Sequence, residues 1–324
     1  MTAFEVTCSR CNIKCSESKK CERFDCELPE YYNAYAKVFK VAPAKYYCSL
    51  TGGINAGKTL YLITLIDSFL RPSKELKLFY QKNKISKIEI IDPVSSGLLN
   101  KLIKQCNDGK LQFTVYNSSL EFFNLIARLT NGEIFEIVLF NSSGEKIEEH
   151  YIRHDTRTDA HELQGSSVIH LLDPREDSGL NDILRAPKAD DDCSNMEITE
   201  YIYEVLKNVN KGVKIVNQPL AVCISKFDLL LPLIPLDLPE DPFTEVHHGD
   251  FFKKIDGTSK RLSTFLANNS RTVDPISLHK QFGKHKYFAI APFGSDAMPA
   301  YWKKRNPKGI YAPFFWILKQ LGII

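Results

Sequence analysis

Residues 52–59 have the types and the spacing to bind phosphate. The segment fits the pattern G-x-x-x-x-G-K-[ST]. The residues expected to contact a nucleotide there are Gly52, Gly53, Ile54, Asn55, Ala56, Gly57, Lys58, Thr59 and Leu60. Glycines let successive backbone N–H groups wrap around a phosphate, and the N-terminus of a following helix adds positive partial charge. We expect Lys58 to reach the β- and γ-phosphates and the Thr59 hydroxyl to bind Mg²⁺.

A second segment, residues 219–228, has the pattern of a base-reading element. Its apolar run ends in Ser225, Lys226, Phe227 and Asp228, close to the pattern [NT]-K-x-D. A carboxylate in the fourth position accepts both N1–H and the exocyclic amino group of guanine, which adenine does not offer in that geometry. We expect Asp228 to select guanine and Lys226 to lay its stem along the base. The alternative is a surface lysine with a helix-capping aspartate.

Residues that could act in turnover and metal binding lie between these two segments. Asn141 ends an apolar run, at the position where a D-x-x-G element has an aspartate that holds Mg²⁺ through water. It keeps an oxygen but not the charge. The amide of Gly144 would sense the γ-phosphate. Glu145 stands where a glutamine would orient the attacking water. Thr114 is expected to complete the Mg²⁺ shell.

The first thirty residues are rich in cysteine. Five thiols lie within nineteen residues, at Cys8, Cys11, Cys15, Cys21 and Cys26. Four thiolates suffice for a tetrahedral Zn²⁺ site, which folds a segment too small to have its own core. Only the first pair has C-x₂-C spacing, and one thiol is spare. Free thiols, a redox-sensitive cluster and an iron–sulfur centre remain alternatives. Basic and acidic residues balance here, which favours docking to a protein over nucleic acid.

These residues need a scaffold of alternating strands and helices. The pattern predicts strands at 46–51, 120–129, 135–140, 168–172, 219–224 and 287–290, and helices at 58–70, 97–105, 198–209, 259–268 and 314–321. Asn131-Gly132 predicts a hairpin between the second and third strands. The expected fold is α/β: a three-layer P-loop fold whose mostly parallel sheet has an antiparallel edge and helices on both faces. We expect residues 1–30 to form a Cys-rich, zinc-knuckle-like segment and residues 31–324 the P-loop domain.

The composition excludes some classes of partner. The 324 residues include 42 Lys and Arg against 39 Asp and Glu, a formal net charge of +3. A charge so close to balance supplies no global field for binding nucleic acid or an anionic membrane. The longest apolar segment, 229–238, contains Pro232, Pro235 and Asp237 and is too short to span a bilayer. We expect a cytoplasmic protein.

With these residues identified, the chain resembles the P-loop GTPases of the translation-factor and Ras-like class. It is more similar to the bacterial double-GTPase family of conflict and defence gene clusters. The closer resemblance covers about residues 45–322. It rests on N-D-G-K-L-Q-F-T at 107–114, V-I-H-L-L-D-P at 168–174, S-K-F-D-L-L at 225–230, and the segments 287–294 and 311–318.

The resemblance implies a guanine-nucleotide switch that hydrolyses GTP to GDP slowly, with Mg²⁺, and controls a partner protein in bacterial defence. A nucleotide-dependent homo-oligomer is a further expectation. The resemblance also implies a base contact at Ala291 and Pro292, where family members have a small residue that donates an N–H to guanine. Pro292 has no N–H to donate, so a neighbouring amide, such as that of Phe293, would have to substitute. Asn141 and Ser225 depart from the family pattern. Two alternatives stay open: a nucleotide-bound pseudo-GTPase scaffold with little or no hydrolysis, and an ATP-binding P-loop protein.

Overall fold

The computed structural model describes residues 43–53, 55–90, 93–108, 121–141, 167–185, 198–210, 212–232, 249–292 and 307–324. It also describes four two-residue strands near the N-terminus: β1 (Val6–Thr7), β2 (Lys14–Cys15), β3 (Lys20–Cys21) and β4 (Cys26–Glu27). β1 pairs with β2 and β3 with β4, both antiparallel.

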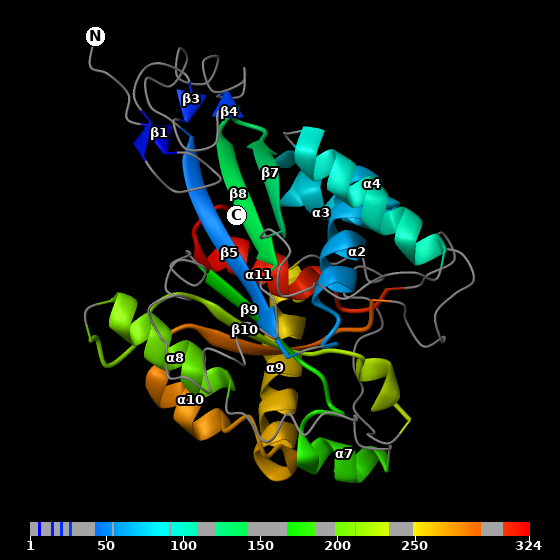
Figure 1. Cartoon of the computed structure of the whole chain (residues 1–324), viewed down its shortest axis with the longest axis vertical. Helices are drawn as coiled ribbons and strands as arrows, with labels where there is room; N and C mark the ends of the chain where they lie inside the picture. The colour runs from blue at the N-terminus through cyan, green and yellow to red at the C-terminus, as the bar shows by residue number, and fades with distance from the viewer. Residues whose placement is uncertain are drawn as a thin grey trace.

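A seven-stranded sheet runs through the centre of the molecule in the order β11-β10-β9-β5-β8-β7-β6 (Figure 1). Its strands are β5 (Ala44–Gly52), β6 (Ile85–Ile90), β7 (Glu121–Leu129), β8 (Ile134–Asn141), β9 (Ser167–Leu172), β10 (Leu220–Ile224) and β11 (His285–Ala289). β7 is antiparallel to both of its neighbours, whereas the other pairings are parallel. After β5 the chain builds one side of the sheet and then crosses to the other, so β5 lies at the topological switch point.

Helices cover both faces of this sheet (Figure 1). They are α2 (Lys58–Leu70), α3 (Lys74–Lys82), α4 (Pro93–Asn107), α7 (Ser178–Leu184), α8 (Ile198–Val209), α9 (Gly249–Asn269), α10 (Pro275–Gln281) and α11 (Tyr311–Gln320). One hydrophobic cluster joins the sheet to α2, α3, α4 and α11, and a second joins it to α7, α8 and α10. The architecture is therefore three-layered.

Alternation along the strands creates these two cores. Ile169 and Leu171 of β9 belong to the first cluster, whereas Val168 and Leu172 belong to the second. Successive side chains of a strand point to opposite faces, so a central strand needs apolar residues on both. All six residues of β9 are buried. This burial explains why the parallel strands are nearly continuous apolar runs in the sequence.

The β11 edge of the sheet is protected by α9. This helix contributes Phe251 and Ile255 to the first cluster and Leu262 and Leu266 to the second, so it crosses the edge from one layer to the other. The hydroxyl of Ser259 on α9 accepts a hydrogen bond of 3.0 Å from the backbone N–H of Tyr287 in β11. An exposed strand edge invites pairing with other chains, and the helix removes that risk here.

Most of the expected elements are confirmed, including the hairpin of β7 and β8 and the antiparallel edge. Four elements among the strands of the central sheet and the α-helices that cover it were not predicted: α3, β6, α7 and α10. Three of these are short helices that begin at side-chain caps, Ser73 for α3, Asp177 for α7 and Asp274 for α10. α9 begins at Gly249, ten residues before its predicted start.

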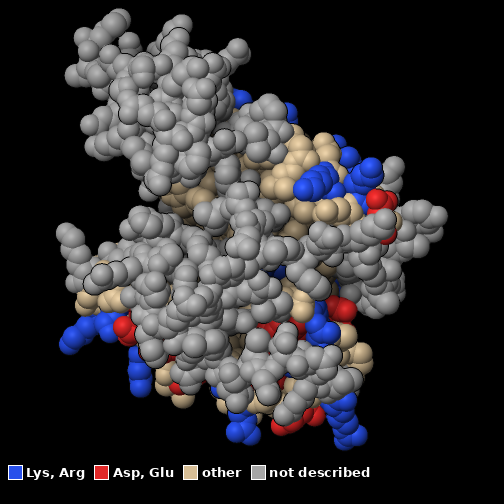
Figure 2. All heavy atoms as spheres, viewed as in Figure 1, with Lys and Arg blue, Asp and Glu red and all other residues tan. Residues whose placement is uncertain are grey.

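The described surface mixes charges of both signs. Figure 2 shows lysine and arginine side chains at several separate places on one face, with acidic side chains among them. In the described part of the chain, no helix is long and apolar enough to span a membrane.

Candidate nucleotide site

The carboxyl ends of the parallel strands bring the predicted site segments to one edge of the sheet. β5 ends at Gly52, β8 at Asn141, β9 at Leu172, β10 at Ile224 and β11 at Ala289. Each is followed by a segment that the sequence analysis singled out. In open α/β sheets, ligands bind in the crevice outside these strand ends at the switch point.

The phosphate loop connects β5 to α2 and has the backbone that its glycines permit. Gly52 and Gly57 have φ of 142° and 87°, and Asn55 also has positive φ, at 65°. A Cβ atom on Gly52 would lie 2.4 Å from the carbonyl oxygen of Leu171 in β9. Only glycine therefore fits at the end of β5, because the neighbouring strand lies too close for a side chain. Ile54 lies outside the described residues.

Lys58 is the first residue of α2 and is buried. Its Nζ donates hydrogen bonds to the carbonyl oxygens of Gly52, at 2.8 Å, and Gly53, at 2.7 Å. The ammonium group thus holds the two ends of the loop together and places a positive charge at the start of α2. Gly57, the residue before the helix, has no side chain to cap the first amides. Uncapped amides and a cation at one point are suited to a phosphate.

Thr59 and Asn141, two of the predicted metal-site residues, lie within hydrogen-bonding distance of each other. Asn141 Nδ2 donates to Thr59 Oγ1 at 3.1 Å. Asn141 ends β8 and is 1% exposed. The fold has therefore brought these residues together from positions 82 apart in the sequence. Thr114, Gly144 and Glu145 lie outside the described residues.

A buried histidine that the sequence analysis did not assign lies beside the loop. His170, on β9, is 2% exposed, and its Nδ1 lies 3.1 Å from the hydroxyl of Thr51 on β5. Burial, together with the charge of Lys58, lowers the pKa of His170 to about 3. The imidazole is therefore neutral near pH 7. A single histidine inside an apolar run was the available signal.

Glu176, which follows β9, also approaches the phosphate loop. A Cβ atom on Gly53 would lie 2.3 Å from Glu176 Oε2. The carboxylate thus lies against the loop backbone at Gly53, and a side chain at this position would displace Glu176. Nothing in the sequence position of Glu176 indicated that it would lie beside the phosphate loop.

On the base side, Ser225 and Lys226 are already engaged with the end of β9. The Ser225 hydroxyl donates to the carbonyl oxygen of Leu172 at 3.1 Å. Lys226 has a left-handed backbone, φ 48°, and its Nζ contacts Asp173 Oδ2. The ammonium group is thus anchored at Asp173, and only its stem remains available to a base.

Asp173 is the centre of this anchor. It is fully buried and accepts hydrogen bonds from Arg175 Nη2 at 2.8 Å and from the Arg175 backbone N–H at 3.0 Å, besides the contact with Lys226. Burial by itself would raise the pKa of Asp173, but hydrogen bonds from Arg175 and the charge of Lys226 outweigh it and leave the pKa lowered. The carboxylate therefore stays ionised.

Asp228, the predicted guanine reader, lies in the short 3₁₀ helix Phe227–Leu229 and is partly buried. Burial raises the pKa of Asp228, and its own backbone amide and Lys226 offset this effect only in part. A carboxylate that is poorly solvated and held close to one cation can accept two hydrogen bonds from a base.

The loop after β11 differs from the expectation for Ala291. Its backbone N–H donates to the carbonyl oxygen of Lys308 at 2.9 Å, and the Lys308 N–H returns a bond of 2.8 Å to Ala291. The amide of Ala291 is therefore directed at Lys308 in this structure. Phe293 lies outside the described residues.

Backbone register places two of the predicted zinc ligands opposite each other. Cys21 of β3 and Cys26 of β4 are cross-strand partners, and Cys15 ends β2. Cys8 and Cys11 lie outside the described residues. Within the described part, no group of three or more His, Cys, Asp and Glu residues is placed to hold a metal.

No family profile matches this chain, and no curated protein sequence matches it. Among solved structures it is similar to the Ski7 GTPase-like domain of S. cerevisiae bound to GTP, at 15% identity and a TM-score of 0.37. That match covers 89% of this chain and 52% of the other, so the chain spans about half of that protein's length.

A GTP-binding protein from Sulfolobus solfataricus in complex with GDP matches 89% of this chain and 56% of its own, at 13% identity and a TM-score of 0.34. The Arl6 small GTPase of Trypanosoma brucei matches 86% of this chain and 98% of its own, at 11% identity and a TM-score of 0.33. Scores this low carry no argument on function, which rests on the residues described above.

Proposed function

We propose that the protein is a guanine-nucleotide-binding switch that uses Mg²⁺ and hydrolyses GTP slowly. The observation that carries the proposal is the position of Lys58. Its ammonium group lies between the carbonyl oxygens of a glycine-bounded loop, at the start of α2 and at the switch point of the sheet. Nucleotide phosphates are the ligands that this combination of charge, amides and space accommodates.

The preference for guanine rests on Asp228. The 3₁₀ helix that holds it follows β10, two strands from β5, so it lies at the same edge of the sheet as the phosphate loop. The contact between Lys226 and Asp173 fixes the residue that leads into this helix. A base that donates two hydrogen bonds to one carboxylate matches guanine.

The residues around Thr59 suit Mg²⁺. The Thr59 hydroxyl is a hard oxygen ligand of the kind that Mg²⁺ prefers, and the Asn141 amide nitrogen, which donates to it at 3.1 Å, holds the hydroxyl in place. The Thr59 hydroxyl would bind the ion directly, with Asn141 behind it and Thr114 completing the shell. Bound Mg²⁺ would neutralise charge on the β- and γ-phosphates. Since Asn141 lacks the negative charge of an aspartate, most of the attraction for the ion has to come from the nucleotide.

The neutral Asn141 also implies slow turnover. Asn141→Asp should strengthen Mg²⁺ dependence and speed single-turnover hydrolysis, because a carboxylate would replace the amide beside Thr59. If neither changes, the result favours the pseudo-GTPase scaffold or a catalytic arrangement that does not use position 141. Glu145 has the same bearing on turnover, since a carboxylate near the γ-phosphate both orders water and repels the phosphate.

A titration tests the proposal directly. Fluorescent GDP, a non-hydrolysable GTP analogue and the matching ATP analogue are added with and without Mg²⁺ to the wild type, to Asp228→Ala and to Asp182→Ala. Asp182 is exposed on α7 and serves as the control. Guanine binding should fall at least about tenfold in Asp228→Ala only. ATP binding that equals GTP binding and ignores Asp228 would establish the ATP-binding alternative instead.

The N-terminal segment is proposed to be a separate zinc-bound unit, residues 1–30, that docks a partner protein of the switch. The cross-strand position of Cys21 and Cys26 supports this reading. Residues 31–324 would then form the nucleotide-binding domain. Metal analysis of the purified chain, with Cys21→Ser and Cys26→Ser compared with Cys48→Ser, tests the zinc. Cys48 is buried in β5 and belongs to the core.

A further inference from the structure

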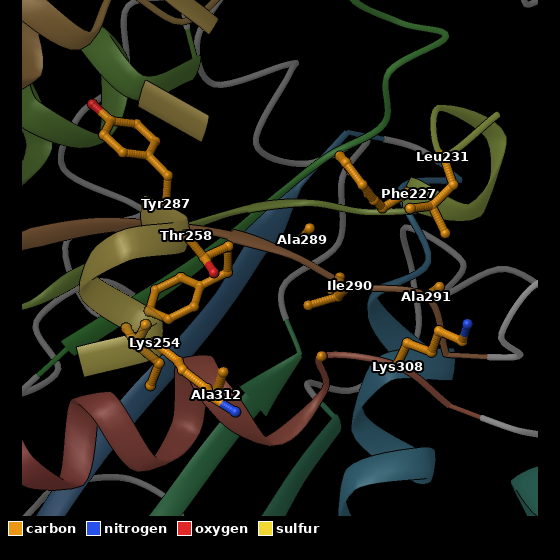
Figure 3. A pocket seen from close by; sticks show the side chains of 13 residues that line it. Phe227, Leu231, Lys254, Thr258, Tyr287, Ala289, Ile290, Ala291, Lys308 and Ala312 are labelled. Carbon is orange, nitrogen blue, oxygen red and sulfur yellow. The ribbon is translucent and has the colours of Figure 1, made fainter. Parts of the chain in front are cut away.

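An apolar cavity of about 270 Å³ lies next to the loop that follows β10 from Ser225 onward, here called the base-reading loop, along the β11 edge of the sheet (Figure 3). Its walls come from the 3₁₀ helix and the residues after it, from α9, from β11 and from the start of α11. The lining includes Phe227, Leu231, Ile255, Phe288, Ile290 and Ala312. An apolar cavity of roughly 150 Å³ is large enough for benzene. This cavity therefore has room for a ring with a short chain, or for a medium alkyl chain.

The cavity is not uniformly apolar. Thr258 lines it, and its hydroxyl oxygen is buried with no hydrogen-bond partner among the described residues. Lys254, one helical turn before Thr258 on α9, also lines the cavity. Figure 3 shows Lys308 at the other end, beside Ala291. A buried hydroxyl without a partner costs stability, and two lysines at an apolar cavity favour an anion.

The cavity adjoins the predicted base site, because Ala291, for which the sequence analysis expected a base contact, lines it. Neither Lys226 nor Asp228 lines the cavity, whereas Phe227 between them does. The Phe227 backbone N–H donates to the carbonyl oxygen of Ile290 at 3.1 Å, which joins the base-reading loop to the cavity wall. A molecule in the cavity would therefore contact both the base-reading loop and the cavity wall formed by β11.

We propose that this cavity binds a small amphipathic anion, a carboxylate with an alkyl or aryl body. The apolar body fills the space between α9 and β11. The Thr258 hydroxyl donates a hydrogen bond to the carboxylate, and Lys254, one turn away on α9, supplies positive charge at that end of the cavity. Binding pockets of this kind combine an apolar lining with a few polar groups that set orientation. The effect of occupancy on the nucleotide rests on the proposed function, but binding of the anion does not.

The test is calorimetric titration of the nucleotide-free, full-length chain with octanoate, and with octylamine as a probe of the same length and opposite charge. We expect octanoate to bind one to one and octylamine at least about tenfold more weakly. Thr258→Val should weaken octanoate about tenfold. Because this change removes an unsatisfied hydroxyl, the variant should fold at least as well as the wild type. Thr264→Val, an exposed position on the same helix, is the matched control.

A second variant, Ala289→Phe, fills the cavity and should abolish octanoate binding. Absence of octanoate binding to the wild type would overturn the proposal, as would equal binding by Thr258→Val or Ala289→Phe. Fluorescent GDP is then titrated with and without octanoate, where a shift of about threefold in GDP affinity is expected. Octanoate binding without any effect on GDP would leave the cavity site standing and remove only its coupling to the nucleotide.

Discussion

Two buried aspartates, four residues apart, are stabilised in different ways. Asp173 is the first residue after β9 and has two cationic partners, Arg175 and Lys226. Asp177 begins α7, and its partners are neutral: the hydroxyls of Ser270 and Thr272, and the backbone amides of Leu180, Arg271 and Thr272. Both are fully buried.

The difference corresponds to what each carboxylate connects. Asp177 joins α7 to the connection between α9 and α10, where the packing is tight. A Cβ atom on Gly179 would lie 1.9 Å from the carbonyl oxygen of Asn269. Asp173 joins β9 to the base-reading loop through a lysine that is 28% exposed. Neutral donors therefore hold the framework in place, whereas a partly exposed cation holds the loop that we propose binds the base.

The largest expected effect is on stability, in Asp177→Ala. The change leaves buried hydroxyls and amides without their acceptor, so the free energy of unfolding should fall by about 3 kcal/mol. Equilibrium unfolding in urea measures this loss. Asp274→Ala, which removes an exposed helix cap on α10, is the control and should cost about 1 kcal/mol. Equal losses in the two variants would show that the buried network adds nothing beyond capping.

The next effect is on ligand affinity, in Asp173→Asn. Lys226 loses its anionic partner, so GDP affinity should fall about tenfold while stability falls by less than in Asp177→Ala. Fluorescent GDP titration and urea unfolding measure the two effects. Arg175→Gln, which keeps the contact between Asp173 and Lys226, should retain most of the affinity. A loss in Arg175→Gln as large as that in Asp173→Asn would contradict a specific role for Lys226.

Acid should remove the stabilisation that Asp173 and Asp177 provide. Burial raises the pKa of each aspartate, but other interactions outweigh it, so both pKa values are lowered. For Asp173 these are hydrogen bonds from Arg175 and the charge of Lys226. For Asp177 they are hydrogen bonds from Ser270 and Thr272. Their stabilisation is present above the unfolded pKa, about 3.9, and is lost as pH falls through the folded values. The stability gap between wild type and each variant should therefore narrow below about pH 4.

His170 adds a separate trend that is common to wild type and both variants. The pKa of this histidine is lowered to about 3, so between that value and about 6.5 only the unfolded chain takes up its proton. Stability should fall as pH falls through this range, and His170→Gln should flatten the slope. Unfolding midpoints measured from pH 7 to 3 check both trends. A gap that stays constant down to pH 3 would argue against ionised aspartates in the folded state.

The smallest expected effect is of salt. Arg175 and Lys226 are 38% and 28% exposed, so ions can screen their pairing with Asp173. The stability loss in Asp173→Asn should shrink by about 0.5 kcal/mol between 0.1 M and 1 M NaCl, roughly a change in screening length from 10 Å to 3 Å. The loss in Asp177→Ala should not change. An equal response of the two variants to salt would remove the distinction between charged and neutral partners.

The sequence predicted the regular part of the fold because its signals are local. Apolar runs marked the parallel strands, and Asn131-Gly132 marked the hairpin. β6 and α3 were missed because each is short, and the strand has only a weak alternation. α9 was predicted too short because its first half packs at the sheet edge, where only one narrow face is apolar.

The site was predictable only where the residues are contiguous. The loop 52–59 is one such segment, whereas the anchor between Asp173 and Lys226 joins positions 53 apart. His170 lies on β9 and Glu176 follows it, and β9 neighbours β5 in space but not in sequence. The engagement of the Ala291 amide with Lys308 depends on where the chain returns before α11. Spacing does not encode such contacts, which the order of strands creates.

The strand order also has a consequence for how the chain folds. β5 is the earliest strand of the sheet in the sequence, yet its two neighbours are β8 and β9, and β9 does not begin until Ser167. Bringing β5 and β9 together closes a long segment of chain, which has an entropic cost. The contacts of β5 with β9 offset that cost only after β9 has formed. During synthesis, the phosphate loop therefore cannot take its final shape until β9 has left the ribosome. A chain truncated before β9 should expose the apolar face of β5 and aggregate.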